Sequence, residues 1–182
     1  MRVQDKVNAK SVKIQSHETS IEMVKDLLDI LHIKKDDVVM DAGSGKNKVW
    51  FNCINSTIKY EYEIKDGNDY LEFKDEVDWT VGNPPYHISW DFHKKAIITS
   101  KKGIAWLVNL NNLNSLFTPK RLDFAKDNGF ELTKMHILSD KRWFGRYFFI
   151  VFEKKKGILT WTKKSYGNNW AEKEAKNQVA KK

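Results

Sequence analysis

Apolar residues recur along the chain at two different spacings, and each spacing predicts a different kind of element. Within residues 20–31 they recur every three or four positions, at Ile21, Val24, Leu27, Leu28 and Leu31. This spacing predicts an amphipathic helix. Residues 58–65 instead alternate apolar and charged side chains. That alternation predicts a β-strand.

The rest of the chain alternates between short apolar runs and helical segments. Further strands are predicted at 38–40, 76–83, 103–110, 131–139 and 146–154, and further helices at about 47–54, 89–99 and 118–130. Strands and helices in alternation, followed by two consecutive strands, predict an α/β fold. We expect a mostly parallel, Rossmann-like sheet with an antiparallel last strand and helices on both faces.

Composition narrows the class of protein. The 182 residues, 41% of them hydrophobic, fit one globular α/β domain. The single cysteine, Cys53, excludes an internal disulfide and a zinc site built from paired cysteines. No stretch approaches the roughly 18 apolar residues of a membrane span, and the N-terminus lacks the apolar core of a secretory signal. We therefore expect a cytoplasmic protein without a membrane partner.

Positive charge is concentrated near the C-terminus. Residues 1–140 carry 20 Lys and Arg against 21 Asp and Glu, whereas residues 141–182 carry 12 against 3. We expect a folded domain at 1–156 and a basic tail at 157–182. Such a tail attracts polyanions, and nucleic acid is the favoured partner. The alternative is a tail that only keeps the protein soluble.

Chemistry-bearing residues follow the first two strands. The tract Asp41-Ala42-Gly43-Ser44-Gly45 ends the first strand, and its glycines permit positive φ and close approach of a ligand. If a nucleoside binds there, an acid after the second strand can accept hydrogen bonds from its ribose. Glu63 is the first candidate and Glu61 the second, and the alternative is a strand carboxylate paired with Lys59 or Lys65. Asp69, in a loop, is a candidate acceptor for an adenine amino group or an ordinary turn residue.

The tetrapeptide Asn83-Pro84-Pro85-Tyr86 follows the strand at 76–83. Both prolines hold φ near −65° and lack an N–H, so the turn is stiff and its carbonyls are free to accept. A planar amino group can donate to the Asn83 side chain and to a proline carbonyl while Tyr86 stacks on its ring. The tract therefore predicts a rigid clamp for an amino group, and the alternative is a turn that ends a strand.

At these two tracts the chain resembles the class I S-adenosylmethionine-dependent methyltransferases, and within them the group that methylates amino nitrogens and carries (D/N/S)-P-P-(Y/F/W). It looks most like the N6-adenine DNA methyltransferases. The resemblance covers roughly residues 14–153 and implies a seven-stranded sheet with a reversed last strand. It departs from the family at residues 63–69, where the helix usually found between the second and third strands is missing.

The resemblance also implies roles for individual residues. Cofactor contacts would come from Thr19, Asp41, Ala42, Gly43, Gly45, Glu63, Asp69 and Asn83, and the catalytic tract would be Asn83, Pro84, Pro85 and Tyr86. Within these sets, Thr19 would meet the methionine carboxylate, Glu63 the ribose and Asp69 the adenine of S-adenosylmethionine. Asn83 and the Pro84 carbonyl would orient the target nitrogen, with Tyr86 stacked on the target base.

Candidate nucleic-acid contacts lie in two places. A basic and aromatic turn between the last two strands holds Lys141, Arg142, Trp143, Phe144 and Arg146, and His87 and Trp90 follow the clamp. Basic residues suit phosphates, and an exposed ring can stack on a base or fill the gap that a flipped base leaves. The alternatives are a hairpin with core aromatics and, for Trp90, a helix-packing face. The histidines lack further ligands, so we assign no metal site.

The sequence therefore predicts an S-adenosylmethionine-dependent methyltransferase for the N6 amino group of adenine in DNA. Two alternatives are methylation of adenine in RNA and methylation of a glutamine amide in a protein. A third is a nucleic-acid-binding partner subunit without activity.

Overall fold

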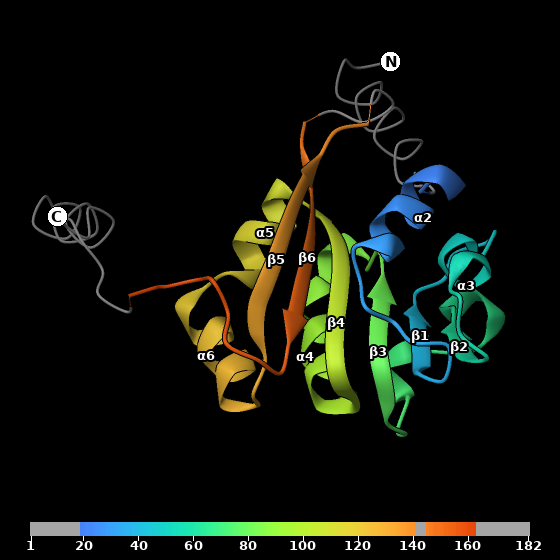
Figure 1. Ribbon diagram of the computed structural model, residues 1–182, viewed down its shortest axis with the longest axis horizontal. Coiled ribbons are helices and arrows are strands. Elements are labelled where there is room, and N and C mark those ends of the chain that lie inside the picture. The colour runs from blue at the N-terminus through green and yellow to red at the C-terminus, as the bar shows by residue number, and fades with distance from the viewer. Residues whose placement is uncertain (1–18, 141–144, 163–182) are drawn as a thin grey trace, which may run out of the picture.

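The computed structural model describes residues 19–140 and 145–162. Six strands form one sheet in the order β2-β1-β3-β4-β6-β5 (Figure 1). They are β1 (Val38–Ala42), β2 (Ile58–Tyr62), β3 (Val77–Gly82), β4 (Ser100–Asn109), β5 (Glu131–Leu138) and β6 (Tyr147–Glu153). The helices are α2 (Ile21–Asp29), α3 (Val49–Cys53), α4 (Ser89–Thr99), α5 (Leu110–Leu116) and α6 (Pro119–Asp127), with short 3-10 helices η1 (Ile64–Asp66), η2 (Tyr70–Glu72) and η3 (Tyr86–Ile88).

The strand directions confirm the predicted sheet. Strands β2, β1, β3 and β4 run parallel to one another, while β6 is antiparallel to both of its neighbours, β4 and β5. The last strand in the sequence is thus the reversed one, and it lies between β4 and β5. The seven strands implied by the family resemblance are wrong for the described residues, which form the six strands that the hydrophobic pattern marks out.

The missing strand is explained by the short connection between β2 and β3. A crossover to a further parallel strand needs about a dozen residues before that strand begins. Residues 63–76 instead form η1 and η2, whose first turns are capped by the carboxylates of Glu63 and Asp69. Tyr70 and Phe73 then anchor the segment to the core with their rings stacked at 6.5 Å. The chain therefore returns directly to the start of β3.

Helices cover both faces of the sheet, as predicted. Helices α4, α5 and α6 pack on one face, in a core that includes Phe92, Leu116 and Leu122. Helices α2 and α3 pack on the other, where Trp50 of α3 stacks on Phe149 of β6 at 5.9 Å. In Figure 1 these two helices lie in front of the sheet.

Local sequence explains most element boundaries, with two exceptions. Helix α4 spans the predicted residues, and the Ser20 hydroxyl caps α2 by accepting from the Met23 N–H at 3.3 Å. Helix α3 begins at Val49 rather than Asn47 because Lys48 adopts a left-handed conformation with φ of 49°. Helix α5 was not predicted, and the side chain of Asn109 caps it.

The residues directly after Lys156 contact the folded domain. The Ile158 N–H donates to the Leu132 carbonyl at 2.9 Å, and the indole N–H of Trp161 donates to the Asp123 carboxylate at 3.1 Å. Residues 157–162 therefore pack on β5 and α6. None of the described helices combines the length and apolar character needed to cross a membrane.

Candidate active site

The predicted cofactor loop and the proline tract meet where β1 and β3 end side by side. Asp41 of β1 pairs in register with Val81 of β3. Directly beyond, Gly82 has φ of +145°, and a Cβ atom there would lie 2.9 Å from the Ala42 carbonyl oxygen. Glycine is thus required at position 82 both for its backbone angle and for space. The close contact holds the start of the proline tract against the end of β1.

The proline tract also contacts the glycine loop itself. Gly43 has φ of +75°, and a Cβ atom at this position would lie 3.6 Å from the Pro85 ring and 3.3 Å from Phe92. Gly45 has φ of +69° with no other atom near its Cβ position. One glycine therefore lets the two tracts approach, and the other keeps the loop open beyond them.

Asp41 is a fully buried carboxyl group at the base of this loop. Its Oδ2 accepts the Phe51 N–H at 2.9 Å, whereas its Oδ1 has no hydrogen-bond partner among the described residues. Burial, helped by the nearby charges of Glu61 and Glu63, raises the pKa of Asp41 to about 7 and outweighs the Phe51 hydrogen bond. An orphaned buried oxygen beside a ligand loop fits a group that would receive a donor from a bound molecule.

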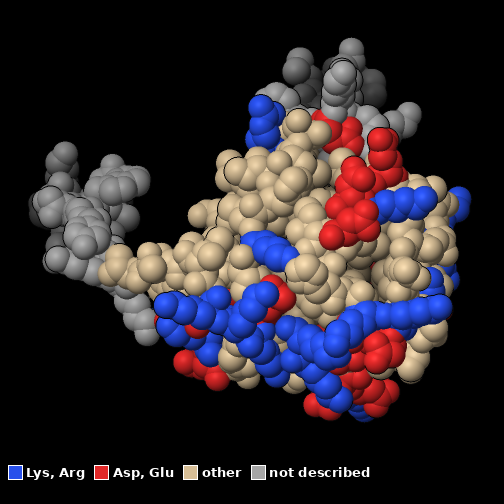
Figure 2. All heavy atoms as spheres, in the orientation of Figure 1, with Lys and Arg blue, Asp and Glu red and all other residues tan. Residues whose placement is uncertain are grey.

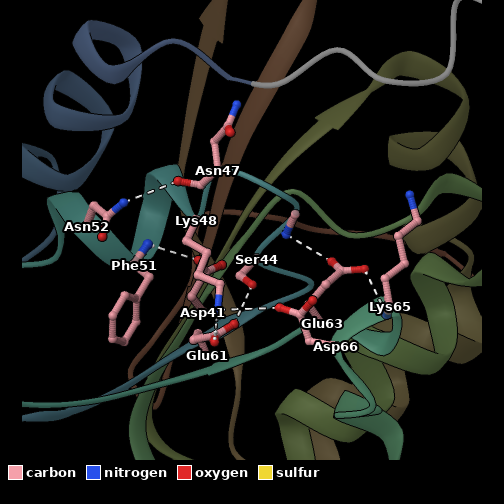
Figure 3. A network of polar contacts seen from close by, with 11 residues as sticks. Asp41, Ser44, Asn47, Lys48, Phe51, Asn52, Glu61, Glu63, Lys65 and Asp66 are labelled. Carbon is pink, nitrogen blue, oxygen red and sulfur yellow. Dashed lines mark hydrogen bonds and ion pairs between the residues drawn. The ribbon is translucent and has the colours of Figure 1, made fainter.

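Glu61 and Glu63 lie on either side of the loop and have different partners (Figure 3). Glu61 accepts from the Ser44 hydroxyl at 2.6 Å and from the Lys48 ammonium at 2.5 Å. Burial opposes its ionisation, but these two bonds outweigh burial and lower the pKa of Glu61. Glu63 accepts from the Gly45 N–H at 2.9 Å. Of the two acids, Glu63 is therefore the one that contacts the backbone of the loop.

The competing interpretation of Glu63 as a strand carboxylate paired with lysine does not match its contacts. Its other oxygen accepts the backbone N–H of Lys65, at 3.3 Å, rather than an ammonium group. The Lys59 ammonium donates instead to the carbonyls of Phe51 and Ile54. Ile64, directly after Glu63, is 68% exposed. The loop is thus bordered by an acid and an exposed apolar side chain.

Asp69 and Thr19 lie at the outer limits of the candidate site. Asp69 Oδ1 accepts the Leu71 N–H at 2.9 Å, which is the ordinary turn role weighed as the alternative. Thr19 is buried and precedes the N-cap of α2. It borders a hollow of about 620 Å³ that is lined by Thr19, Ser20, Ile21, Lys25, Asn47, Val49, Asn52 and Cys53. Thr19 therefore faces the segment that follows the glycine loop.

The acceptors of the proline tract are only partly used by the protein. The Pro85 carbonyl accepts the Ile88 N–H at 3.2 Å and so closes the turn η3. No hydrogen bond found among the described residues involves the Asn83 side chain or the Pro84 carbonyl. Of the two proline carbonyls, only the one at 85 thus accepts a hydrogen bond among the described residues.

Tyr86 is 45% exposed and has a partner that the sequence did not indicate. Its side chain lies close enough to Tyr147, the buried first residue of β6, for that residue to influence its pKa. Burial, followed by the influence of Tyr147, raises the pKa of Tyr86 above its ordinary value. Tyr147 lies in register with Asn109 at the end of β4, so strand pairing delivers it to this edge. Only the sheet order could have revealed this pair.

The predicted nucleic-acid contacts are spread over several environments. His87 and Arg146 are exposed, and Lys141, Arg142, Trp143 and Phe144 lie outside the described residues. Trp90 has the helix-packing role weighed as its alternative. Its ring meets Phe124 of α6 edge-on at 5.8 Å, with the Arg121 guanidinium 4.6 Å from its ring centre.

Basic side chains of the described residues gather away from the edge of the sheet where β1 and β3 end. Figure 2 shows them along the lower part of the front face, where β3 and β4 begin. Lys102, near the start of β4, pairs there with Asp37 at 2.5 Å and Asp78 at 3.1 Å. Part of this positive charge is thus neutralised within the protein.

Known structures share this architecture. A putative RNA methyltransferase from Pyrococcus horikoshii matches with a TM-score of 0.55 and 16% identity, over 85% of this chain and 98% of that chain. This is the fold of the class I methyltransferases. The 23S rRNA methyltransferase ErmE matches with a TM-score of 0.55 and 14% identity, over 81% of this chain and 73% of that one.

A third match has a cofactor product bound. The magnesium protoporphyrin IX methyltransferase from Synechocystis PCC 6803, solved with S-adenosylhomocysteine, matches with a TM-score of 0.53 and 12% identity, over 74% of this chain and 82% of that one. No protein-family model matches the sequence, and the search of curated proteins found no match. At identities this low, the matches show that the fold is shared and show nothing beyond the fold.

Proposed function

We propose that this chain is an S-adenosylmethionine-dependent methyltransferase that acts on the N6 amino group of adenine in DNA. The contact between the two predicted tracts carries the proposal. The Pro85 ring lies against Gly43 of the glycine loop, 3.6 Å from its Cβ position. An amino group held by Asn83 would thus lie beside any ligand held by the loop. Methyl transfer to nitrogen needs this closeness of donor and acceptor.

The residues around the loop fit the proposed cofactor. Gly43 and Gly45 would lie along its methionine part, and the Asp41 Oδ1 is an unused acceptor at the base of the loop. Glu63, which accepts the Gly45 N–H, would accept from the ribose. Thr19, Ala42 and Asp69 remain proposed cofactor contacts. When bound, the cofactor supplies an electrophilic methyl group on a positively charged sulfur.

The chain's own part in the reaction is positioning. The Asn83 side-chain oxygen and the Pro84 carbonyl are acceptors, and each would take one hydrogen from the target amino group. These two bonds draw the nitrogen lone pair out of conjugation with the base. Tyr86, which follows the two prolines directly, would stack on the base and fix its plane. The amino nitrogen needs no prior deprotonation in this arrangement.

The proposal is tested by offering a labelled methyl donor to four substrates in parallel: single-stranded DNA, duplex DNA, RNA and a protein extract. We expect label in DNA, and digestion of the product should yield N6-methyladenine. Label in RNA would transfer the same chemistry to the other polymer, and label in a glutamine amide would refute a nucleic-acid substrate. No transfer to any of the four would leave the partner-subunit alternative.

Asn83→Ala tests the clamp itself. We expect loss of methyl transfer with unchanged binding of S-adenosylhomocysteine, measured by calorimetry, because Asn83 would orient the target more than hold the cofactor. Asn114→Ala, at an exposed position on α5, is the matched control and should keep both properties. Full turnover by Asn83→Ala would remove the clamp from the mechanism.

A further inference from the structure

Strand β2 ends the sheet of the described residues, and its outer side pairs with no other strand there. In Figure 1 it lies at the side of the sheet opposite β5. An unpaired strand edge offers a row of backbone donors and acceptors to another chain. This edge exists because residues 63–76 form η1 and η2 and return to β3 without a further strand.

The register of β2 identifies which backbone groups face outward. The Tyr62 carbonyl accepts the N–H groups of Gly43 and Ser44, so Tyr62 faces β1, as does Tyr60 two residues before it. The N–H and C=O groups of Lys59 and Glu61 therefore point away from the sheet. Among the described residues, no turn or loop hydrogen bond uses them.

The side chains of β2 leave this edge accessible. A lysine at a sheet edge usually blocks pairing, but the Lys59 ammonium is turned back to the Phe51 and Ile54 carbonyls, at 2.8 and 3.1 Å. On the opposite face, Ile58 is 45% exposed and Tyr60 is 46% exposed. The edge thus presents free backbone groups beside an apolar strip.

We propose that a second copy of this chain pairs with β2 in antiparallel orientation, with Tyr60 opposite Tyr60 of the second copy. In this register Lys59 lies opposite Glu61 of the second copy. The two-fold axis generates an equivalent pair, in which Glu61 lies opposite Lys59 of the second copy. Both pairs bring outward-facing backbone groups together, as an antiparallel hydrogen-bonded pair requires. Lys59 and Glu61 keep their partners within the chain, and this register places charges of opposite sign, rather than of like sign, in neighbouring positions.

Neighbouring registers are excluded by the same residues. A shift of one residue places outward-facing groups opposite groups that already bond to β1. A shift of two residues places Lys59 opposite Lys59, or Glu61 opposite Glu61, which is unfavourable. The centred register also buries Tyr60 against its own copy and Ile58 against Tyr62 of the second copy. The result is an isologous dimer in which two six-stranded sheets join.

Sedimentation equilibrium of the full chain tests the assembly. We expect a concentration-dependent dimer that Tyr60→Asp converts to monomer, because the substitution places two carboxylates opposite each other. Ile98→Asp is the control, since Ile98 is also exposed, at 60%, but lies on α4. A monomeric wild-type chain throughout the micromolar range would overturn the proposal, as would a dimer unaffected by Tyr60→Asp.

A cross-link tests the register. Directly opposed residues of a non-hydrogen-bonded antiparallel pair have Cα atoms about 4.5 Å apart, which is within disulfide range. With Cys53 replaced by serine, Tyr60→Cys should form an intermolecular disulfide on mild oxidation, and Ile98→Cys should not. A dimer that fails to cross-link at position 60 would show that the chains pair elsewhere. Neither measurement depends on methyltransferase activity.

Discussion

Replacement of Asp41 by asparagine should make the protein more stable at neutral pH. Asp41 is fully buried, and its pKa is raised from 3.8 to about 7 by burial and by the charges of Glu61 and Glu63. Above pH 7 the folded protein therefore holds an unfavourable buried charge. Asparagine keeps an oxygen for the Phe51 N–H and never ionises.

The size of the effect follows from the two pKa values. Between pH 3.8 and about 7 the unfolded chain has lost the proton and the folded chain retains it, so stability falls as pH rises. At about 1.4 kcal/mol for each pH unit, the penalty reaches about 4 kcal/mol above pH 7. Burying the new amide also has a free-energy cost, but this cost does not depend on pH. It therefore shifts the difference in stability between the two proteins by a constant and leaves the pH dependence of that difference unchanged.

Urea unfolding of both proteins from pH 5 to pH 8 measures the slope, because every other titrating group is common to the pair. The free energy of unfolding of the wild type should fall relative to Asp41→Asn by about 3 kcal/mol over this range. A difference that does not change with pH would refute the raised pKa, and with it the burial that raises it.

Asp37→Asn is a control in which the change in stability at neutral pH should have the opposite sign. Burial disfavours the charge of Asp37, but hydrogen bonds from the Lys102 ammonium and the Lys34 N–H outweigh burial and lower its pKa. This lowered pKa stabilises the folded state above pH 3.8, and the stabilisation is lost as pH falls through the folded pKa. The variant should therefore be less stable than the wild type at neutral pH, with a difference that shrinks in acid.

Further tests concern the start of the proline tract and the basic tail. Gly82→Ala should cost of order 1–3 kcal/mol in urea unfolding through its positive φ and a backbone clash, and Gly67→Ala, with open space at its Cβ position, should cost less. Removal of the chain after Thr162 should weaken nucleic-acid binding and flatten its salt dependence, measured by fluorescence anisotropy; unchanged binding would leave the basic tail only a role in solubility.

The sequence predicted much of the site because its main features are local. Positive φ at Gly43 and Gly45 and the stiffness of Pro84-Pro85 depend on a few bonds of backbone, and the structure has both glycines in the left-handed region. The order of strands and helices also follows from local periodicity. A strand alternates with period two and a helix with period 3.6, whatever lies opposite them.

Partners that are distant in sequence were not predictable in the same way. Tyr147 meets Tyr86 only because β6 inserts beside β4, and the choice between Glu61 and Glu63 depends on which acid reaches the Gly45 N–H. Trp90 illustrates the reverse case. Its residue type and its position after the clamp predicted a contact with nucleic acid, but its ring packs against Phe124 and Arg121 of α6.

By itself, then, the sequence determined the α/β order of elements, the glycine loop and the rigid Asn83–Tyr86 turn, since short-range sterics suffice for each. Tertiary structure decided that the Pro85 ring lies against Gly43, that Asp41 is buried with a raised pKa, and that no described strand pairs with the outer side of β2. Burial and strand pairing depend on groups far apart in the chain. Only the folded arrangement brings those groups together.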